Sequence, residues 1–306
     1  MRGWYILHDD LVMEIALLID SKEDYKGSHI GDYSFFWGSE NNGLKKISKQ
    51  IERYYNDKVD FLYYGNEFCE YRIPSINQLL QVLDICKKDK ISCVLVTPIV
   101  TDYGIEKITN LLDYLIYNNI SLDIVVNDMG VLELLRKKEY SGKAIIGRVL
   151  EKSSHDCRAS ADEFDDYYGD NGKKFARTPG IISDYTQMIF NKYGIERYEF
   201  DLPRIGLDLP ENRDYSLYWP YSYLTTGRVC MFRSLDLKGR NKFLVGETGC
   251  GKKCTQYKVE KRKPLNGYSL PPKPDLFLFQ KGNTIFFLNE ESDLYTDCFN
   301  RLIIQI

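Results

Sequence analysis

Apolar runs of strand length alternate with segments of helical periodicity through the first half of the chain, at intervals of roughly thirty residues. The runs that we expect to be strands are 32–38, 59–67, 91–100, 122–128 and 143–150. Between them, 73–90 and 104–119 carry apolar residues at helical spacing, and Ser75 is a candidate N-cap. Strands that alternate with helices in this way predict a parallel sheet with right-handed crossovers.

A closed barrel and an open doubly wound sheet both accommodate this repeat. The open sheet usually carries a glycine-rich nucleotide loop after its first strand. Here that position reads GSENNGLKK (38–46), which matches neither the dinucleotide nor the P-loop pattern. We therefore predict an α/β fold, a TIM-barrel-like (β/α) barrel, and leave open whether it is complete, incomplete or distorted. Residues 1–31 are expected to be an N-terminal extension packed on a single barrel domain that spans 32–306.

The second half of the chain continues the pattern less regularly. We expect a helix over 181–193 and strands over 197–203, 215–227 and 301–306. The polar, glycine-rich segment 153–180 predicts a long loop over the mouth of the barrel, because such loops in compact domains usually serve function. Two apolar runs around Lys281, Gly282 and Asn283 predict a late β-hairpin over 276–289.

Composition and charge disfavour several classes of protein. Of the 306 residues, 43% are hydrophobic, enough for a sizeable core, and the net charge of −3 gives no broad basic surface for nonspecific nucleic-acid binding. The apolar run at the N-terminus is interrupted by Asp9, Asp10 and Glu14, so it predicts neither a signal peptide nor a membrane span. With eight cysteines and no secretory signal, we expect a cytoplasmic protein with thiols or metal ligands rather than disulfides.

The segment 229–257 concentrates cysteines in an unusual setting. It holds Cys230, Cys250 and Cys254, the last two in a C-x3-C loop rich in glycine and lysine. Buried structural cysteines normally lie among apolar residues, and this loop is too polar for a core. Its glycines allow the backbone to bend around a ligand. The loop is therefore a candidate metal or iron–sulfur site that needs a fourth ligand.

Cys69 is the best candidate for that ligand, because it ends the predicted second strand. The C-terminal ends of barrel strands meet on one face, and Cys230 follows the predicted seventh strand on the same face. Four thiolates are the ligands of structural zinc or of an iron–sulfur cluster, and the spacing does not separate these two or exclude four unrelated thiols. The remaining cysteines predict core positions for Cys86, Cys93 and Cys298, and a weak candidate ligand or reactive thiol at Cys157, near His155.

Several short motifs, in this order, resemble those of a known family. They are FFWGSENNGLKK, FLYYGNEFCEYR, ISCVLVTPIV, IVVNDMGVLELL, SYLTTGRVCMFR, GCGKKC and LFLFQKGNTIFFLN. Their order and joint spacing, over roughly 32 to 306, resemble the collagenase-like peptidase family U-32 in its UbiV-like branch. The chain departs from that branch in its additional N-terminal residues, in a longer insertion between Cys230 and Cys250, and after the fifth predicted strand.

The resemblance implies a four-iron four-sulfur cluster on Cys69, Cys230, Cys250 and Cys254. It also implies a part in oxygen-independent hydroxylation, with prephenate as the proposed oxygen donor, in a heterodimer with a second member of the family. The substrate stays open among a small molecule, an RNA base and a peptide. A composition rich in Lys, Asn and Tyr suggests an anaerobe of low GC content.

Basic residues adjoin the candidate ligands, and two of them are candidate catalytic residues. Arg72 and Arg228 could hold a dicarboxylate donor, and with Lys252 and Lys253 they could lower the thiol pKa values. The plainer interpretation is that all four are surface charges.

Other classes of function remain. The protein could be a non-catalytic electron-relay or structural subunit, or a binding protein stabilised by zinc. A protease is disfavoured, because the chain's histidines form no HExxH or Ser/His/Asp motif.

Overall fold

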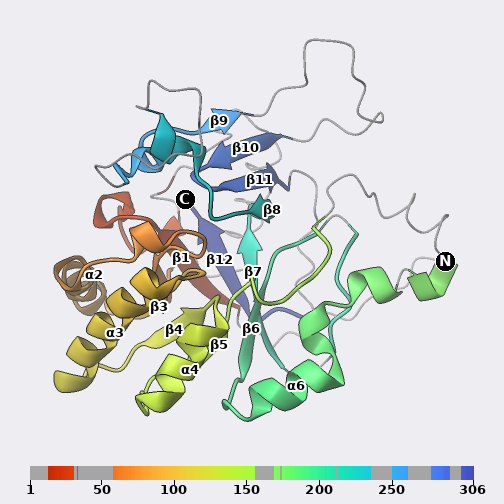
Figure 1. Ribbon diagram of the computed structural model, residues 1–306, viewed down its shortest axis with the longest axis horizontal. Helices are drawn as coiled ribbons and strands as arrows, with labels where there is room; N and C mark the ends of the chain where they lie inside the picture. The colour runs from red at the N-terminus through yellow and green to blue at the C-terminus, as the bar shows by residue number, and fades with distance from the viewer. Residues whose placement is uncertain are drawn as a thin grey trace.

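The computed structural model describes residues 13–30, 33, 58–155, 169–172, 174–203, 205–210, 213–235, 250–260, 277–289 and 298–306. Eight strands close into a barrel in the order β1-β12-β7-β6-β5-β4-β3-β2 (Figure 1). Every neighbouring pair around the barrel is parallel. The strands are β1 (Glu14–Ile19), β2 (Phe61–Gly65), β3 (Ser92–Val96), β4 (Asp123–Val126), β5 (Ala144–Ile146), β6 (Arg197–Phe200), β7 (Asp214–Trp219) and β12 (Arg301–Gln305). The predicted barrel is confirmed, and it is closed.

Helices cover the outside of the barrel (Figure 1). They are α2 (Ile76–Asp89), α3 (Asp102–Tyr117), α4 (Met129–Lys137) and α6 (Asp184–Asn191). α2 begins at the predicted cap, because the Ser75 side chain accepts a hydrogen bond from the Gln78 amide and the Gln78 side chain accepts one from the Ser75 amide. Its buried face, with Leu79 and Val82, belongs to the large core cluster between barrel and helices. Among the described residues, no helix is long and apolar enough to cross a membrane.

The structure corrects the predicted role of residues 14–19, which we expected to belong to an N-terminal extension. Residues 14–19 form the first strand of the barrel wall, between β12 and β2, rather than an extension packed on its surface. The sequence EIALLI is apolar on both faces, as in a parallel strand covered from both sides. The strand that we predicted over 32–38 lies, apart from Tyr33, outside the described residues.

The predicted seventh strand, 215–227, is two strands in two sheets. Pro220 separates β7 from β8 (Tyr221–Thr226), because proline has no N–H group to continue the ladder. β8 joins a small antiparallel sheet of order β8-β11-β10-β9, with β9 (Val259–Glu260), β10 (Leu278–Lys281) and β11 (Thr284–Leu288). β10 and β11 form the predicted hairpin, and Gly282 in its turn has a φ of 63°. The small sheet lies at the end of the barrel toward which β7 points (Figure 1).

The segment 153–180 is also more regular than predicted. Residues 169–172 and 174–177 are helical, and a 3-10 turn, η4 (Gly180–Ile182), precedes α6. Residues 156–168 lie outside the described part of the chain.

Candidate functional site

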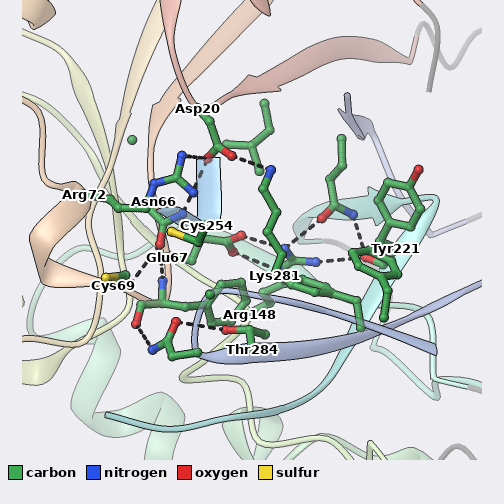
Figure 2. A pocket seen from close by; sticks show the side chains of 18 of the residues that line it. Asp20, Asn66, Glu67, Cys69, Arg72, Arg148, Tyr221, Cys254, Lys281 and Thr284 are labelled. Carbon is green, nitrogen blue, oxygen red and sulfur yellow. Dashed lines mark hydrogen bonds and ion pairs between the residues drawn. The ribbon is translucent and has the colours of Figure 1, made fainter. Parts of the chain in front are cut away.

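A pocket of about 70 Å³ lies between the C-terminal ends of the barrel strands and the small sheet (Figure 2). One wall is aromatic and is formed by Phe68, Phe279 and Phe286. The Phe279 and Phe286 rings stack with centroids 5.3 Å apart, and Phe68 meets Phe286 edge-on at 5.6 Å. Cys69 and Cys254 also line this pocket. This placement agrees with the rule that barrel sites form where the strands end.

The opposite wall is polar. The Asp20 carboxylate, just after β1, lies 2.9 Å from Nη2 of Arg72 and 2.6 Å from Nζ of Lys281 in β10. Burial raises the pKa of Asp20, yet the charges of Lys281 and Arg72 outweigh it and hold that pKa well below its usual range. The three side chains point toward one another in Figure 2 and connect the barrel to the small sheet.

Arg148, which follows β5, forms the floor of the pocket. Its Nε donates to Glu67 Oε1 at 2.8 Å and its Nη2 to Glu67 Oε2 at 2.6 Å, a bidentate pair. Nη1 donates to Asp201 Oδ1 at 2.5 Å and to the Tyr221 carbonyl at 3.1 Å, and Nη2 donates to Gln305 at 3.0 Å. These bonds use all five N–H groups of the fully buried guanidinium, so Arg148 organises the floor rather than offering donors to a ligand.

The turn after β2 places Glu67 and Cys69. Gly65 has a φ of 134°, and a Cβ atom there would lie 2.2 Å from the Val96 carbonyl oxygen, so only glycine fits. The Asn66 side chain then accepts hydrogen bonds from the amides of Phe68 and Cys69, at 3.0 and 2.9 Å. This Asx turn directs the Glu67 side chain to the pocket floor and leaves Cys69 at the pocket edge.

The structure brings the four candidate cysteines to the same end of the barrel. Cys69 precedes the 3-10 turn η3 (Glu70–Arg72), Cys230 precedes η5 (Met231–Ser234), and Cys254 lies in η6 (Lys253–Thr255). Burial, together with the charges of Cys254, Cys250 and Cys230, raises the pKa of Cys69 to about 11. Burial and neighbouring cysteines likewise raise the pKa values of Cys230 and Cys254, although Arg72 opposes this at Cys254. The four thiols are therefore close enough to interact electrostatically.

Four thiols suit an iron–sulfur cluster or zinc in the kind and number of their donors. Within the part of the chain that the structure describes, no three His, Cys, Asp or Glu side chains are yet close enough together to bind a metal ion. The donor set fits a soft metal centre chemically, and the ligand geometry itself is not formed in this structure.

The other predicted site residues differ in whether they line the pocket. Arg72 lines the pocket, whereas Arg228 does not, and its Nη2 donates to the Val100 carbonyl at 3.1 Å. Lys252 is exposed and Lys253 is half-buried, and neither lines the pocket.

The remaining cysteines follow the prediction where the structure describes them. Cys86 is buried on α2 and hydrogen-bonds Cys93 of β3, and Cys298 packs against the core. Cys157 lies outside the described residues. Its neighbour His155 is within 3.2 Å of Glu151 and packs on the Tyr223 ring, with centroids 4.1 Å apart.

Sequence reasoning missed four polar residues that line the pocket, Asp20, Glu67, Arg148 and Lys281, and also Asp201, which accepts a hydrogen bond from Arg148. Asp20 was missed because its segment was assigned to an extension. Arg148 could have been identified from the sequence, because a charged residue directly after a short buried barrel strand is typical of a functional site.

Comparisons with known proteins add little to this geometry. No protein-family profile matches the chain, and no curated protein matches it. Among solved structures, that of the U32 peptidase Mk0906 is similar, with a TM-score of 0.38 and 9% sequence identity. The alignment covers 100% of this chain and 96% of that chain. A likeness this distant carries no conclusion about chemistry, and the barrel itself rests on the strand order described above.

Proposed function

We propose that this chain is an iron–sulfur protein resembling the UbiV-like branch of the U32 peptidase family, and a subunit of an oxygen-independent hydroxylation system. Cys69, Cys230, Cys250 and Cys254 are the proposed ligands of a four-iron four-sulfur cluster at the C-terminal end of the barrel. A second protein of the same family is the proposed partner.

The observation that supports the cluster is the mutual influence of four thiols drawn from three separate segments. Burial raises the pKa values of Cys69, Cys230 and Cys254, that of Cys69 to about 11, so these three thiols favour the protonated form in the metal-free protein. A soft metal centre displaces such protons and holds the sulfurs as thiolates.

The bound cluster would supply electron transfer, or activation of the oxygen donor, at the edge of the pocket. Arg72 would offset its negative charge, because this guanidinium interacts electrostatically with Cys254 and Cys69 while Asp20 holds it in place. Phe68, Phe279 and Phe286 would exclude water from the opposite wall. A carboxylate donor would approach Arg72 and Lys281, the two cations of the polar wall.

Two observations favour the alternative of a non-catalytic electron-relay or structural subunit. Arg72 and Lys281 are already paired with Asp20, and Arg148 has no unused N–H group. The pocket of about 70 Å³ is also small beside typical ligand sites of ~300 Å³ or more. A substrate site shared with the partner subunit would reconcile the small pocket with catalysis.

Anaerobic reconstitution with iron and sulfide tests the cluster. The proposal predicts brown protein that bleaches with dithionite and contains iron and sulfide rather than zinc. Serine at any of the four proposed ligands should remove most of the iron, whereas Cys86→Ser and Cys298→Ser serve as matched controls and should retain it. Colourless protein with zinc on the same four cysteines would leave the zinc-stabilised binding protein as the better account.

Activity assays of the protein alone and with a second family member separate the enzyme from the relay subunit. Hydroxylated product from this chain alone makes it the catalytic subunit. If product forms only when the partner is present, and still forms after Arg72→Ala, this chain is a relay subunit. Loss of product with an intact cluster after Arg72→Ala supports donor binding at Arg72.

A further inference from the structure

A carboxyl group inside the barrel lies beneath the pocket floor. Glu199 of β6 is fully buried and faces the barrel interior, since its neighbours Tyr198 and Phe200 pack in the outer core cluster. Its Oε2 accepts a hydrogen bond from the Tyr218 hydroxyl at 2.8 Å. Its Oε1 has no hydrogen-bond partner among the described residues. A buried, ionised carboxylate with one oxygen unpaired costs free energy, so the neutral, protonated form of Glu199 is favoured.

Among the residues that the structure describes, no basic side chain forms a direct ion pair with Glu199. The Arg148 guanidinium pairs with Glu67 and Asp201. The Arg301 guanidinium, from β12, donates to Glu14 and donates to the Tyr63 hydroxyl at 2.9 Å. The polar groups that act on Glu199 are thus Tyr63, Glu67, Tyr218 and, at longer range, Arg301. Apolar side chains also form a cluster in the interior, with Ala16, Val94, Val96, Val125, Ile145 and Ile303 as members. Polar groups are present as well, because Arg197 of β6 donates to the buried Ser216 hydroxyl at 3.2 Å and to Glu14 at 3.2 Å.

Burial, neighbouring charges and hydrogen bonds together place the titration of Glu199 near neutral pH. Burial and, to a smaller extent, the charge of Glu67 raise the pKa of Glu199, which is about 7 once the opposing effects are included. Hydrogen bonds from Tyr218 and Tyr63, and the charge of Arg301, lower it by less.

Tyr218 connects this carboxyl group to the pocket floor. While its hydroxyl binds Glu199, its ring lies under Arg148, with Cζ 3.9 Å from the ring centroid. Arg148 balances two carboxylates, Glu67 and Asp201, with one positive charge (Figure 2 shows Arg148 beside Glu67). Another negative charge on Glu199 would strengthen its bond to Tyr218 and add repulsion against both carboxylates.

We propose that Glu199 is a proton-binding site inside the barrel, and that loss of its proton shifts Tyr218 and loosens the Arg148 cluster in the pocket floor. Glu199 is a positioning residue in this account, because it acts on the pocket through Tyr218 and Arg148. The proposal does not depend on a metal centre.

Infrared titration of the full chain tests the proton site. The wild-type protein should show a carboxylic acid band that disappears with a midpoint near pH 7 and that is absent from Glu199→Gln. Tyr218→Phe keeps the ring against Arg148 but removes the hydrogen bond to the ionised form, so the midpoint should rise. No such band, or an unchanged band in Glu199→Gln, overturns the proposal. An unchanged midpoint in Tyr218→Phe overturns the role of Tyr218, even if Glu199→Gln fails to fold.

The coupling to the pocket has its own readout in the Tyr223 amide, which donates to Asp201 Oδ2 at 3.0 Å. Its NMR shift should titrate with the infrared midpoint in the wild type and should lose that titration in Glu199→Gln. The Thr101 amide donates to Glu70 at 2.7 Å, outside the Arg148 cluster, and provides the matched control that should not follow this midpoint. A Tyr223 amide that titrates identically in both proteins overturns the coupling.

Discussion

The carboxylate of Asp20 lies 2.6 Å from the ammonium group of Lys281, and this ion pair joins the end of β1 to the small sheet. Arg72 approaches the same carboxylate from the turn after β2. Asp20 therefore fixes two cations on the polar wall of the pocket, and one of them interacts electrostatically with the candidate cluster cysteines.

Asp20→Asn should destabilise the fold by about 2–3 kcal/mol, because it leaves Arg72 and Lys281 without their shared anion. Urea unfolding at neutral pH measures this loss. Asp113→Asn is the control, since the Asp113 ion pair with Lys138 is exposed and should contribute less than about 0.5 kcal/mol. Equal losses in the two variants would show that Asp20 is no more than a surface charge. Because its folded pKa is depressed, the Asp20 contribution should be present above about pH 4 and lost below it.

Glu199 should give the opposite pH dependence. Its pKa is about 7 in the folded protein against an ordinary value of 4.5 for glutamate, so the folded state binds the proton more tightly than the unfolded chain. Its contribution to the free energy of unfolding is therefore largest below about pH 4.5 and declines by about 3 kcal/mol as pH rises to about 7. Denaturant unfolding across this range should show the decline in the wild type and a flatter profile in Glu199→Gln. A wild-type profile that rises with pH over the same window contradicts this assignment.

Gly65→Ala should be strongly destabilising, by about 3 kcal/mol or more, because the added Cβ would lie 2.2 Å from the Val96 carbonyl oxygen at a φ of 134°. Gly227→Ala is the matched control, since no heavy atom lies within 4 Å of its added Cβ and its φ is not positive. Thermal unfolding compares the two. The turn after β2 also positions Cys69, so Gly65→Ala should reduce iron retention in protein that still folds. Full stability and full iron content in Gly65→Ala would refute this view of the turn.

Metal uptake should release protons, because the pKa of Cys69 is about 11 and those of Cys230 and Cys254 are also raised in the metal-free protein. Apparent affinity for the metal should therefore increase as pH rises through the neutral range. Titration of the apoprotein with zinc in a weakly buffered indicator solution measures the protons released. Release that is the same after Cys69→Ser would show that Cys69 is not a ligand.

The barrel was predictable because its strands are short, apolar on both faces and separated by amphipathic helices. β1 was misassigned because 32–38 carries an equally good strand pattern, and a single sequence does not show which of the two pairs with β12. The break between β7 and β8 could have been predicted at Pro220, because proline has no N–H group for the strand ladder, although the apolar pattern continues through both strands.

The site was predictable only in part, for a spatial reason. The cysteines could be grouped because strand ends in a barrel share a face. The Asp20–Lys281 and Arg148–Asp201 pairs join residues far apart in sequence, and their partners are fixed by the closure of the barrel and by the placement of the small sheet. No local pattern around Lys281 indicates that it faces Asp20.

The most direct test of the account is the iron and sulfide content of anaerobically reconstituted Cys69→Ser beside Cys86→Ser. Cys69 is the proposed ligand that comes from a different part of the barrel than the 229–257 segment, so it distinguishes a shared site from a local cysteine loop. The account predicts about four iron and four sulfide per chain in the wild type and in Cys86→Ser, and a small fraction of this in folded Cys69→Ser. Full iron and sulfide in Cys69→Ser would contradict it.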